Sequence, residues 1–291
     1  MKTFKAVLKS MRPKQWSKNL IIFAGILFSQ NITELPMLLS VIAAFVIFCV
    51  ISGAVYIFND IADLDSDRKH PVKALRPIAS GRLGVKKALA AMAALVLAGL
   101  CAAFYFGPYF FAAILAYLFL QLGYTLYFKY IVILDVFSIA AGFVLRVVAG
   151  ALVIDVAISS WLIICTILLS LFLGFSKRRH ELESMVEGAV HHRKVLGDYS
   201  VYLLDQMISV VTASTVISYA LYTMSDETIL KFGTTNLIFT VPFVLYGIFR
   251  YLYLIHKKGE GGNPENILVK DIPLIADIFL WAATAALILY F

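Results

Sequence analysis

Four aspartates stand within residues 60–67, directly after a long apolar segment. Asp60, Asp63 and Asp67 are spaced i, i+3 and i+7, so a helix that continues through the stretch would present these three carboxylates on one face. Carboxylates so close together repel one another, and a bound cation relieves that repulsion. Oxygen ligands favour hard ions, and Mg²⁺ typically binds a few carboxylates together with substrate phosphates. The spacing therefore indicates a Mg²⁺-diphosphate site, and the alternative is a solvated acidic end of a helix.

Basic residues follow the aspartates immediately. Within residues 68–77 stand Arg68, Lys69, Lys73 and Arg76. Carboxylates hold a metal ion while Lys and Arg hold phosphate oxygens, so the two sets together are typical of a site for a phosphate ester. We expect Lys73 and Arg76 to bind the substrate. The alternative is that these bases only mark the cytoplasmic face of a membrane protein.

The rest of the chain is too apolar for a soluble enzyme. Of its 291 residues, 61% are hydrophobic and 15% are charged, whereas soluble domains have about 45–50% and about 25%. This composition excludes a disordered chain, a secreted disulfide scaffold and an ordinary nucleic-acid-binding domain, despite a formal net charge of +7. Cys49, Cys101 and Cys165 lie in apolar runs without metal-ligand spacing, and we expect buried thiols.

Membrane-spanning helices, each of about 20 apolar residues, must therefore position the charged stretches. We predict an all-α bundle of about nine transmembrane helices that forms a single domain over residues 1–291. The helices are predicted near residues 20–31, 36–58, 86–106, 109–128, 131–153, 158–176, 205–224, 235–255 and 273–290. Two long charged connections, near 59–85 and 177–204, are expected to carry the catalytic residues, because loops rather than spans usually do so.

The distribution of Lys and Arg predicts the orientation. Of the 25 Lys and Arg residues, all but two fall in connections on one side; Lys231 falls on the other side and Arg146 within a span. The positive-inside rule then places the N-terminus in the cytoplasm and the C-terminus outside. We expect a multi-pass protein of the inner (cytoplasmic) membrane, surrounded by membrane lipid, with its active site facing the cytoplasm. The sequence leaves open whether it forms a homo-oligomer.

The pattern Asn59-Asp60-x-x-Asp63-x-x-x-Asp67 resembles the first aspartate-rich motif of the UbiA superfamily of intramembrane prenyltransferases. The resemblance covers essentially the whole chain and implies that family's bundle of nine helices. In the family this motif binds Mg²⁺ and the diphosphate of an isoprenoid donor. The resemblance therefore implies that the three aspartates hold Mg²⁺ as cofactor, and that Asn59 orients a water or a substrate hydroxyl.

A second aspartate-rich motif, which the family usually carries after its sixth helix, has no counterpart at the expected spacing. The basic triplet Lys177-Arg178-Arg179 stands there instead, and Asp198 and Asp205 follow seven residues apart. A site with bases in place of carboxylates should bind more phosphate directly and less through metal. We therefore expect the triplet to bind a substrate that is richer in phosphate than a prenyl diphosphate.

Four stretches, in order, are similar to one branch of the family, the polyprenyl-phosphate phosphoribosyltransferases. They are residues 12–19, 59–81, 135–150 and 177–182. This likeness implies phosphoribosyl pyrophosphate as donor and a polyprenyl phosphate as acceptor. The lipid phosphate would attack C1 of the ribose as diphosphate leaves. The product would be polyprenyl-phosphoryl-5-phosphoribose, for cell-envelope or lipid-linked pentose synthesis.

Two polar residues lie within the predicted span 131–153. An arginine at the centre of a membrane helix costs roughly 2.5–3.5 kcal/mol on insertion scales, so it usually faces a cavity or a partner. For Arg146 we favour a cavity role in substrate binding over a structural pair with a buried carboxylate. Asp135 is either a metal-side or ribose contact or a structural hydrogen-bonding residue.

Two further pairs are candidates for substrate binding. Tyr124 and Lys129 resemble the Tyr and Lys that lie near the diphosphate in the family. Lys14 and Lys18 stand one turn apart near the N-terminus and would clamp the lipid or ribosyl phosphate. Alternatively, a basic helix with Trp16 at the interface only anchors the chain to the membrane surface.

Two other functions compete with phosphoribosyl transfer. The first is a Mg²⁺-dependent prenyltransferase that attaches a prenyl chain to an aromatic acceptor, which two aspartate clusters would favour over one cluster and a basic triplet. The second is a transporter, which would show broken helices, inverted repeats and polar groups near the midplane. The concentration of charge at one face counts against transport.

Overall fold

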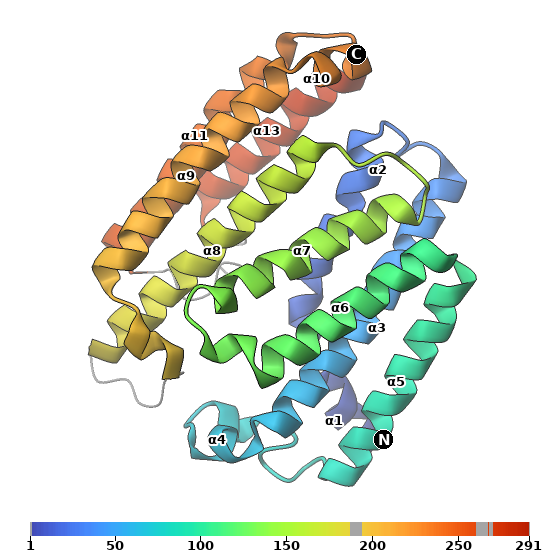
Figure 1. Ribbon diagram of the computed structural model, residues 1–291, viewed down its shortest axis with the longest axis vertical. Helices are drawn as coiled ribbons and strands as arrows, with labels where there is room; N and C mark the ends of the chain where they lie inside the picture. The colour runs from blue at the N-terminus through green and yellow to red at the C-terminus, as the bar shows by residue number, and fades with distance from the viewer. Residues whose placement is uncertain (1, 187–193, 260–266, 268–269, 291) are drawn as a thin grey trace. The chain divides into compact units, whose positions relative to one another are not determined.

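The apolar segments fold into helices in the computed structural model, which describes residues 2–186, 194–259, 267 and 270–290 (Figure 1). All regular elements in these ranges are helical, which confirms the predicted all-α class. Within the described ranges, eight helices are long and apolar enough to cross a membrane. The chain divides into two compact units, Met1–Ile158 and Ser159–Phe291, which we call unit 1 and unit 2.

Unit 1 carries the aspartate-rich stretch. In order it contains α1 (Lys2–Ser10), η1 (Pro13–Phe23), α2 (Ala24–Phe28), α3 (Leu35–Ala62), α4 (Leu64–Lys69), η2 (Lys73–Leu75), α5 (Val85–Tyr105), α6 (Pro108–Leu126), η3 (Phe128–Tyr130) and α7 (Leu134–Leu152), where η marks a 3₁₀ helix. α3 and α7 bury more than half of their most apolar windows, whereas α5 exposes most of its own. α3 and α7 are therefore the central helices of this unit.

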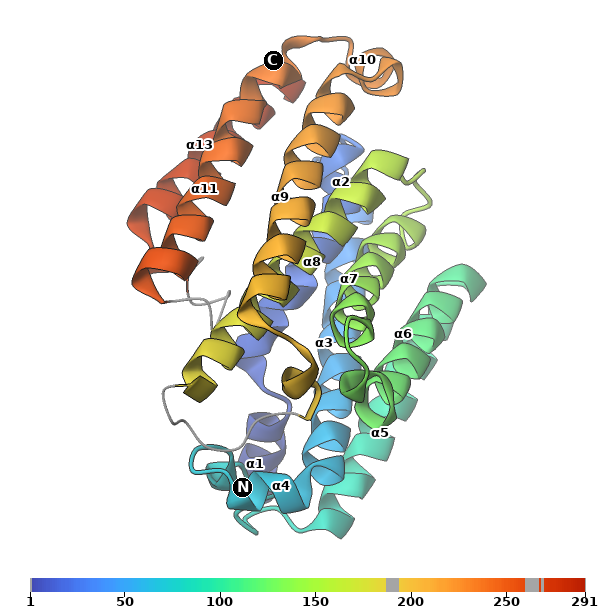
Figure 2. The same cartoon turned by 60° about the vertical axis from the view of Figure 1, so that its left-hand side comes forward.

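The first predicted span, residues 20–31, is not one regular helix, so the prediction of a ninth long helix is wrong for this segment. η1 is a 3₁₀ helix of 11 residues and α2 is an α-helix of 5. At about 2.0 Å per residue for a 3₁₀ helix and 1.5 Å for an α-helix, the two together extend roughly 30 Å. That length matches the bilayer core, about 30 Å thick. Figures 1 and 2 show α2 at one end of unit 1, and the N-terminus and α4 at the other.

A close backbone approach holds η1 against α7. A Cβ atom added at Gly150 would lie 2.0 Å from the carbonyl oxygen of Ile22, so only glycine fits without a shift of the backbone. We expect Gly150→Ala to lower the free energy of unfolding by about 2 kcal/mol, as overpacking does elsewhere. Thermal unfolding of the purified protein measures this. Gly197→Ala, where no atom lies within 4 Å, is the control; equal melting temperatures for all three proteins would contradict the packing.

The cysteines only partly follow the prediction of buried thiols. Cys49 on α3 is buried and Cys165 on α8 (Ser160–Val186) is half-buried, but Cys101 is exposed. Cys101 lies on α5, whose most apolar window is largely exposed. A thiol is a small, nearly apolar group, so a lipid-facing position suits it without burial in protein.

Unit 2 consists of helices throughout its described residues. They are α8, η4 (Lys194–Asp198), α9 (Val201–Met224), α10 (Asp226–Phe232), η5 (Asn236–Thr240), α11 (Val241–Lys258) and α13 (Ile272–Tyr290). α9 begins where Oγ of Ser200 accepts a hydrogen bond from the backbone N–H of Leu203 at 3.1 Å. α8 continues ten residues beyond its predicted end at 176, so the basic triplet lies on a helix and not on a loop. Of the predicted connection 177–204, residues 187–193 lie outside the described part.

Candidate active site

The aspartate-rich stretch lies where α3 ends and α4 begins. Asp63 stands between the two helices with φ −96° and ψ 12°, so a single helix does not run through the stretch as the spacing suggested. Asp60, in the last turn of α3, and Asp67, in α4, are nevertheless both buried, with 2% of each residue exposed. Asp65 between them is exposed. The change of direction at Asp63 therefore buries two of the carboxylates and leaves another in solvent.

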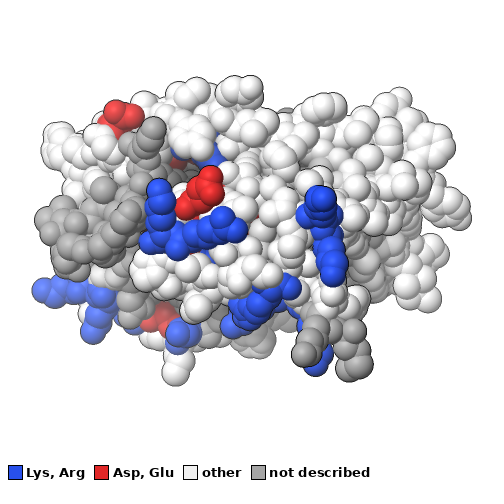
Figure 3. All heavy atoms as spheres, turned by 90° about the horizontal axis from the view of Figure 1, so that it is seen from below, with Lys and Arg blue, Asp and Glu red and all other residues white. Residues whose placement is uncertain are grey.

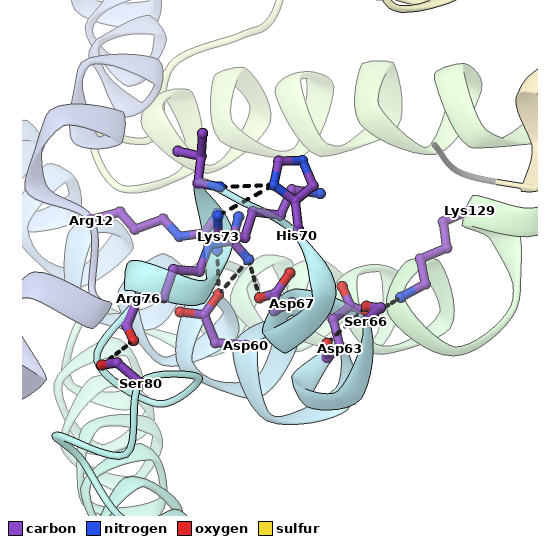
Figure 4. Close-up of polar contacts among 11 residues, drawn as sticks. Arg12, Asp60, Asp63, Ser66, Asp67, His70, Lys73, Arg76, Ser80 and Lys129 are labelled. Atoms are coloured by element: carbon purple, nitrogen blue, oxygen red, sulfur yellow. Dashed lines mark hydrogen bonds and ion pairs between the residues drawn. The ribbon is translucent and has the colours of Figure 1, made fainter. Parts of the chain in front are cut away.

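One guanidinium joins the two buried carboxylates (Figure 4). Nη1 of Arg76 donates to Oδ1 of Asp60 at 3.1 Å and also to Oδ2 of Asp67. Two oxygens bonded to the same nitrogen lie within roughly 6 Å of each other, because a hydrogen bond is about 3 Å long. Mg²⁺ binds through one or two carboxylates plus substrate phosphates. The donor set of Asp60 and Asp67 therefore fits such an ion in the place that the guanidinium nitrogen occupies.

Arg12 belongs to this site, although it was not among the predicted site residues and only began the stretch 12–19 that resembles the family. Its Nη2 donates to Oδ1 of Asp60, and its guanidinium carbon lies 5.0 Å from the centre of the Tyr56 ring. Arg12 connects α1 to η1 with a φ of 52°, which is uncommon for a residue other than glycine. The following Pro13 disfavours the right-handed helical conformation at Arg12 and so ends α1 there. This Arg-Pro pair is the one local signal, but its distance from Asp60 in the sequence hides the contact.

Asp63 has a different partner from the other two aspartates. Its Oδ1 accepts a hydrogen bond from Nζ of Lys129 at 2.6 Å, and the Lys129 side chain is only 10% exposed. One helical turn earlier on α6, Oγ1 of Thr125 donates to Oδ1 of Asn59. Within the described ranges, no three His, Cys, Asp or Glu side chains converge closely enough to hold a metal ion on their own. Metal binding by Asp63 thus remains a prediction, while its pairing with the predicted Lys129 is present.

The remaining predicted residues of unit 1 differ in their burial. The backbone N–H of Lys73 donates to Nδ1 of His70 at 3.3 Å, in the loop that also carries Arg76 (Figure 4). The others lie on helices: Lys14 is exposed and Lys18 half-buried on η1, Tyr124 is half-buried on α6, and Asp135 is fully buried in the first turn of α7. Their roles in substrate binding remain predictions.

Arg146 is buried in the middle of α7 and binds protein groups. Nε donates to Oδ1 of Asn19 at 2.7 Å, Nη1 to the Gly142 carbonyl at 2.8 Å and Nη2 to the Tyr117 hydroxyl at 2.9 Å. The guanidinium carbon also lies 4.7 Å from the centre of the Tyr117 ring. Among the described residues, no carboxylate forms an ion pair with Arg146, so the partners seen are neutral groups. The guanidinium instead joins η1, α6 and α7.

In unit 2, the two arginines of the basic triplet are paired with carboxylates. Nη1 of Arg178 donates to Oε2 of Glu181, and Nη1 of Arg179 donates to Oε2 of Glu183 at 2.6 Å. Both arginines are buried, with 2% and 7% of the residue exposed. The acids were visible in the sequence, but as glutamates three and four residues later rather than as an aspartate motif. A helix brings them next to the bases, which the predicted loop would not.

A third carboxylate links this cluster to other helices of unit 2. Oδ1 of Asp205 on α9 accepts a hydrogen bond from Nε of Arg179 at 2.6 Å and lies 3.2 Å from Nε2 of His256 on α11. Lys177 is half-buried, and no ion pair of its side chain occurs among the described residues. The three bases of the triplet thus differ in their ion pairs, and phosphate binding by the triplet remains a prediction.

The end of unit 1 that carries α4 is rich in charged residues. Figure 3 shows the lower face of Figure 1, where Lys and Arg gather and acidic side chains lie beside them. In unit 1 this end carries α4, and the carboxylate–arginine cluster lies there (Figures 1 and 4). The basic end that the positive-inside pattern predicts for unit 1 is thus present in space.

Known proteins resemble this chain in sequence along nearly its whole length. Residues 19–268 match the UbiA prenyltransferase family. A decaprenyl-phosphate phosphoribosyltransferase of Corynebacterium glutamicum is 30% identical over 289 residues, which cover 98% of this chain and 86% of that protein. An enzyme of the same name from Mycolicibacterium smegmatis is 28% identical, over 98% of this chain and 92% of the relative.

Solved structures share the fold. A UbiA homolog from Archaeoglobus fulgidus bound to GPP and Mg²⁺ superposes with a TM-score of 0.71 at 19% identity, over 98% of this chain and 100% of that one. A structure of digeranylgeranylglyceryl phosphate synthase gives a TM-score of 0.69, also at 19% identity, over 98% and 99%. The family match, the relatives and the apolar helices together show that this multi-pass membrane protein belongs to the UbiA prenyltransferase family.

Proposed function

We propose that the protein is a Mg²⁺-dependent polyprenyl-phosphate phosphoribosyltransferase of the cytoplasmic membrane, with its active site facing the cytoplasm. The observation that carries the proposal is the joining of Asp60 and Asp67 by one arginine, next to a second arginine. Carboxylates for a metal ion and guanidinium groups for phosphate oxygens are the two components that a diphosphate leaving group requires. Relatives that bear this enzyme name over nearly the whole chain support the choice of phosphoribosyl transfer within the family.

The reaction exchanges one C–O bond for another at C1 of the ribose. An oxygen of the polyprenyl phosphate attacks C1, and the bond from C1 to the diphosphate breaks through an oxocarbenium-like transition state. The products are polyprenyl-phosphoryl-5-phosphoribose, a precursor for cell-envelope or lipid-linked pentose synthesis, and free diphosphate. A phosphate monoester is already an anion, so the acceptor needs no strong general base. Positioning and electrostatic stabilisation supply most of the rate enhancement.

The residues of unit 1 have distinct parts in this proposal. Asp60 and Asp67 hold the Mg²⁺, which neutralises charge on the leaving diphosphate. Arg76 and Lys73 bind phosphate oxygens, and Lys129 orients Asp63 through their 2.6 Å contact. Asp135 contacts the ribose or lies on the metal side, Asn59 orients a water or a ribose hydroxyl, and Tyr124 lies near the diphosphate. Lys14 and Lys18 on η1 contact the lipid or ribosyl phosphate. The apolar surface around the helices lets the polyprenyl chain stay in the membrane.

A transfer assay tests the proposal directly. Purified protein in detergent receives Mg²⁺, a polyprenyl phosphate and phosphoribosyl pyrophosphate labelled in the ribose. We expect label to enter the organic phase and EDTA to abolish the transfer. No transfer with acceptors of several chain lengths would refute the proposal.

We expect substitution of Lys177 to weaken donor binding, and substitution of Arg179 to lower the stability of the fold. Lys177 has no ion pair among the described residues, so Lys177→Ala should raise KM for phosphoribosyl pyrophosphate by about tenfold, as loss of one charged contact does. Arg179 pairs with Glu183 and Asp205, so Arg179→Ala should mainly lower the melting temperature. Steady-state kinetics and thermal unfolding of both variants measure this. An unchanged KM for Lys177→Ala would mean that Lys177 does not bind the donor. The basic triplet would then only mark the cytoplasmic side of the membrane.

Prenyl transfer to an aromatic acceptor is the second candidate. The observation that favours it is that two carboxylates of unit 2, Glu183 and Asp205, share the partner Arg179, because a second acidic pair suits the second metal ion of ordinary prenyltransferases. The same purified protein would then prenylate an aromatic acid from a prenyl diphosphate and transfer no ribose label. Incubation with each donor in turn separates the two reactions.

A further inference from the structure

We propose that Arg12 and Arg76 form an exchangeable arginine pair: they neutralise Asp60 and Asp67 while no metal ion is bound, and bind the donor's diphosphate once a metal ion takes their place. The inference rests on the proposed function only in requiring a metal ion and a diphosphate at this site. It adds Arg12 to the site and couples the binding of metal to the binding of the anion.

The contacts place both arginines on the atom that a metal ion would need. Oδ1 of Asp60 accepts hydrogen bonds from Nη2 of Arg12 and, at 3.1 Å, from Nη1 of Arg76. The same Nη1 also donates to Asp67. A cation that binds Oδ1 of Asp60 and Oδ2 of Asp67 therefore displaces the guanidinium of Arg76 from both carboxylates and that of Arg12 from Asp60. The displaced groups remain next to the ion, where the phosphate oxygens of a diphosphate would bind.

The formal charges give the reason for coupling. Asp60 and Asp67 contribute two negative charges and the arginine pair contributes two positive ones, so the cluster is balanced without a metal ion. Adding a divalent cation leaves an excess of two positive charges in a site where both carboxylates are 2% exposed. The arginine side chains are 29% and 27% exposed, so solvent screens part of this excess, and the part beside the buried carboxylates stays uncompensated. A diphosphate anion offsets this excess, so metal and anion should each bind weakly alone and tightly together.

Arg12 is suited to move between the two partners. Its guanidinium lies 5.0 Å from the centre of the Tyr56 ring, a cation–π contact that can persist after release from Asp60. The side chain is 29% exposed, whereas that of Asp60 is 2% exposed, so the arginine approaches the carboxylate from the solvent side. The backbone of Arg12 has a φ of 52°. Such conformations in residues other than glycine cluster at functional sites, where the surroundings hold them in place.

Direct binding measurements test the exchange without any sugar or lipid substrate. The full-length protein in detergent is titrated with Mn²⁺, and the free ion is followed by electron paramagnetic resonance. Separately, retention of ³²P-labelled pyrophosphate is measured at saturating Mg²⁺. The test variant is Arg12→Gly, because glycine adopts a positive φ readily and keeps the turn while it removes the guanidinium. The control is Arg82→Ala, which removes one positive charge from the connection that carries Arg76 but no contact with an aspartate among the described residues.

The two measurements should change in opposite directions. We expect Arg12→Gly to bind Mn²⁺ alone about tenfold more tightly and labelled pyrophosphate about tenfold more weakly, the size expected for one charge-assisted hydrogen bond. Arg82→Ala should change neither value. Mn²⁺ binding that is unchanged or weaker in Arg12→Gly would overturn the exchange, as would an equal tightening in Arg82→Ala. The binding measurements use no ribose donor, so their outcome does not depend on the reaction that the protein catalyses. Failure of the separate phosphoribosyl transfer assay would refute the proposed function and leave the arginine exchange standing.

Discussion

Asp60→Asn is expected to lower the rate of phosphoribosyl transfer by about 10³-fold, the size of effect seen when one strong electrostatic contact to a transition state is lost. The side chain of Asp60 is 2% exposed and its Oδ1 receives two guanidinium groups. An amide keeps the shape but removes the negative charge, so the metal ion loses a ligand and both arginines lose their counter-ion. The transfer assay with saturating Mg²⁺ and donor measures the loss.

Asp65→Asn is the matched control for this experiment. It makes the same chemical change two residues before Asp67, but Asp65 is exposed. We expect activity within twofold of the parent protein, as for other surface substitutions of about 0.5 kcal/mol or less. Melting temperatures of both variants separate lost catalysis from lost folding. Full Mg²⁺-dependent activity of a folded Asp60→Asn variant would show that the metal ligands lie elsewhere.

The long helices were predictable because a helix that crosses a bilayer needs about 20 consecutive apolar residues. Each of the eight apolar segments from 36–58 onward became a helix of the length that a bilayer requires. The prediction of one regular helix over 20–31 was wrong, and hydropathy alone could not have corrected it. Ile22 in this segment approaches the backbone of Gly150, and such a contact between residues far apart in the sequence does not show in a hydropathy profile. Hydropathy also cannot say where a charged helix ends in water, so α8 extended past its predicted end.

The site was predictable where its residues are neighbours in sequence. The aspartate spacing and the bases of the next ten residues identified Asp60, Asp67 and Arg76, which do form one cluster. Arg12 was missed because its contact with Asp60 joins residues 48 positions apart. The basic triplet 177–179 predicts phosphate binding because the sequence shows its charges but not the ion pairs that they form. Only the helical course of α8 reveals that Glu181 and Glu183 neutralise its two arginines.

Asn19→Leu is expected to lower the free energy of unfolding by roughly 3 kcal/mol, because it removes an acceptor from a buried charged donor. Oδ1 of Asn19 accepts from Nε of Arg146 at 2.7 Å, and Arg146 is 5% exposed. Nδ2 of Asn19 also donates to Oγ of Ser52 at 3.3 Å, so the amide connects η1 to both α3 and α7. With no carboxylate pairing to it among the described residues, the guanidinium depends on such neutral acceptors. Thermal unfolding measures the loss.

The double variant Asn19→Leu/Arg146→Met decides what Arg146 does. Removing the buried charge together with its acceptor should recover at least half of the stability lost in Asn19→Leu, because the two residues form one hydrogen-bonded unit and their effects do not add. We expect the double variant also to recover transfer activity, since each of the three guanidinium nitrogens donates a hydrogen bond to a protein group. A double variant that folds stably but transfers no ribose would establish the predicted role of Arg146 in substrate binding. Additive loss of stability would instead mean that Asn19 and Arg146 stabilise the fold independently.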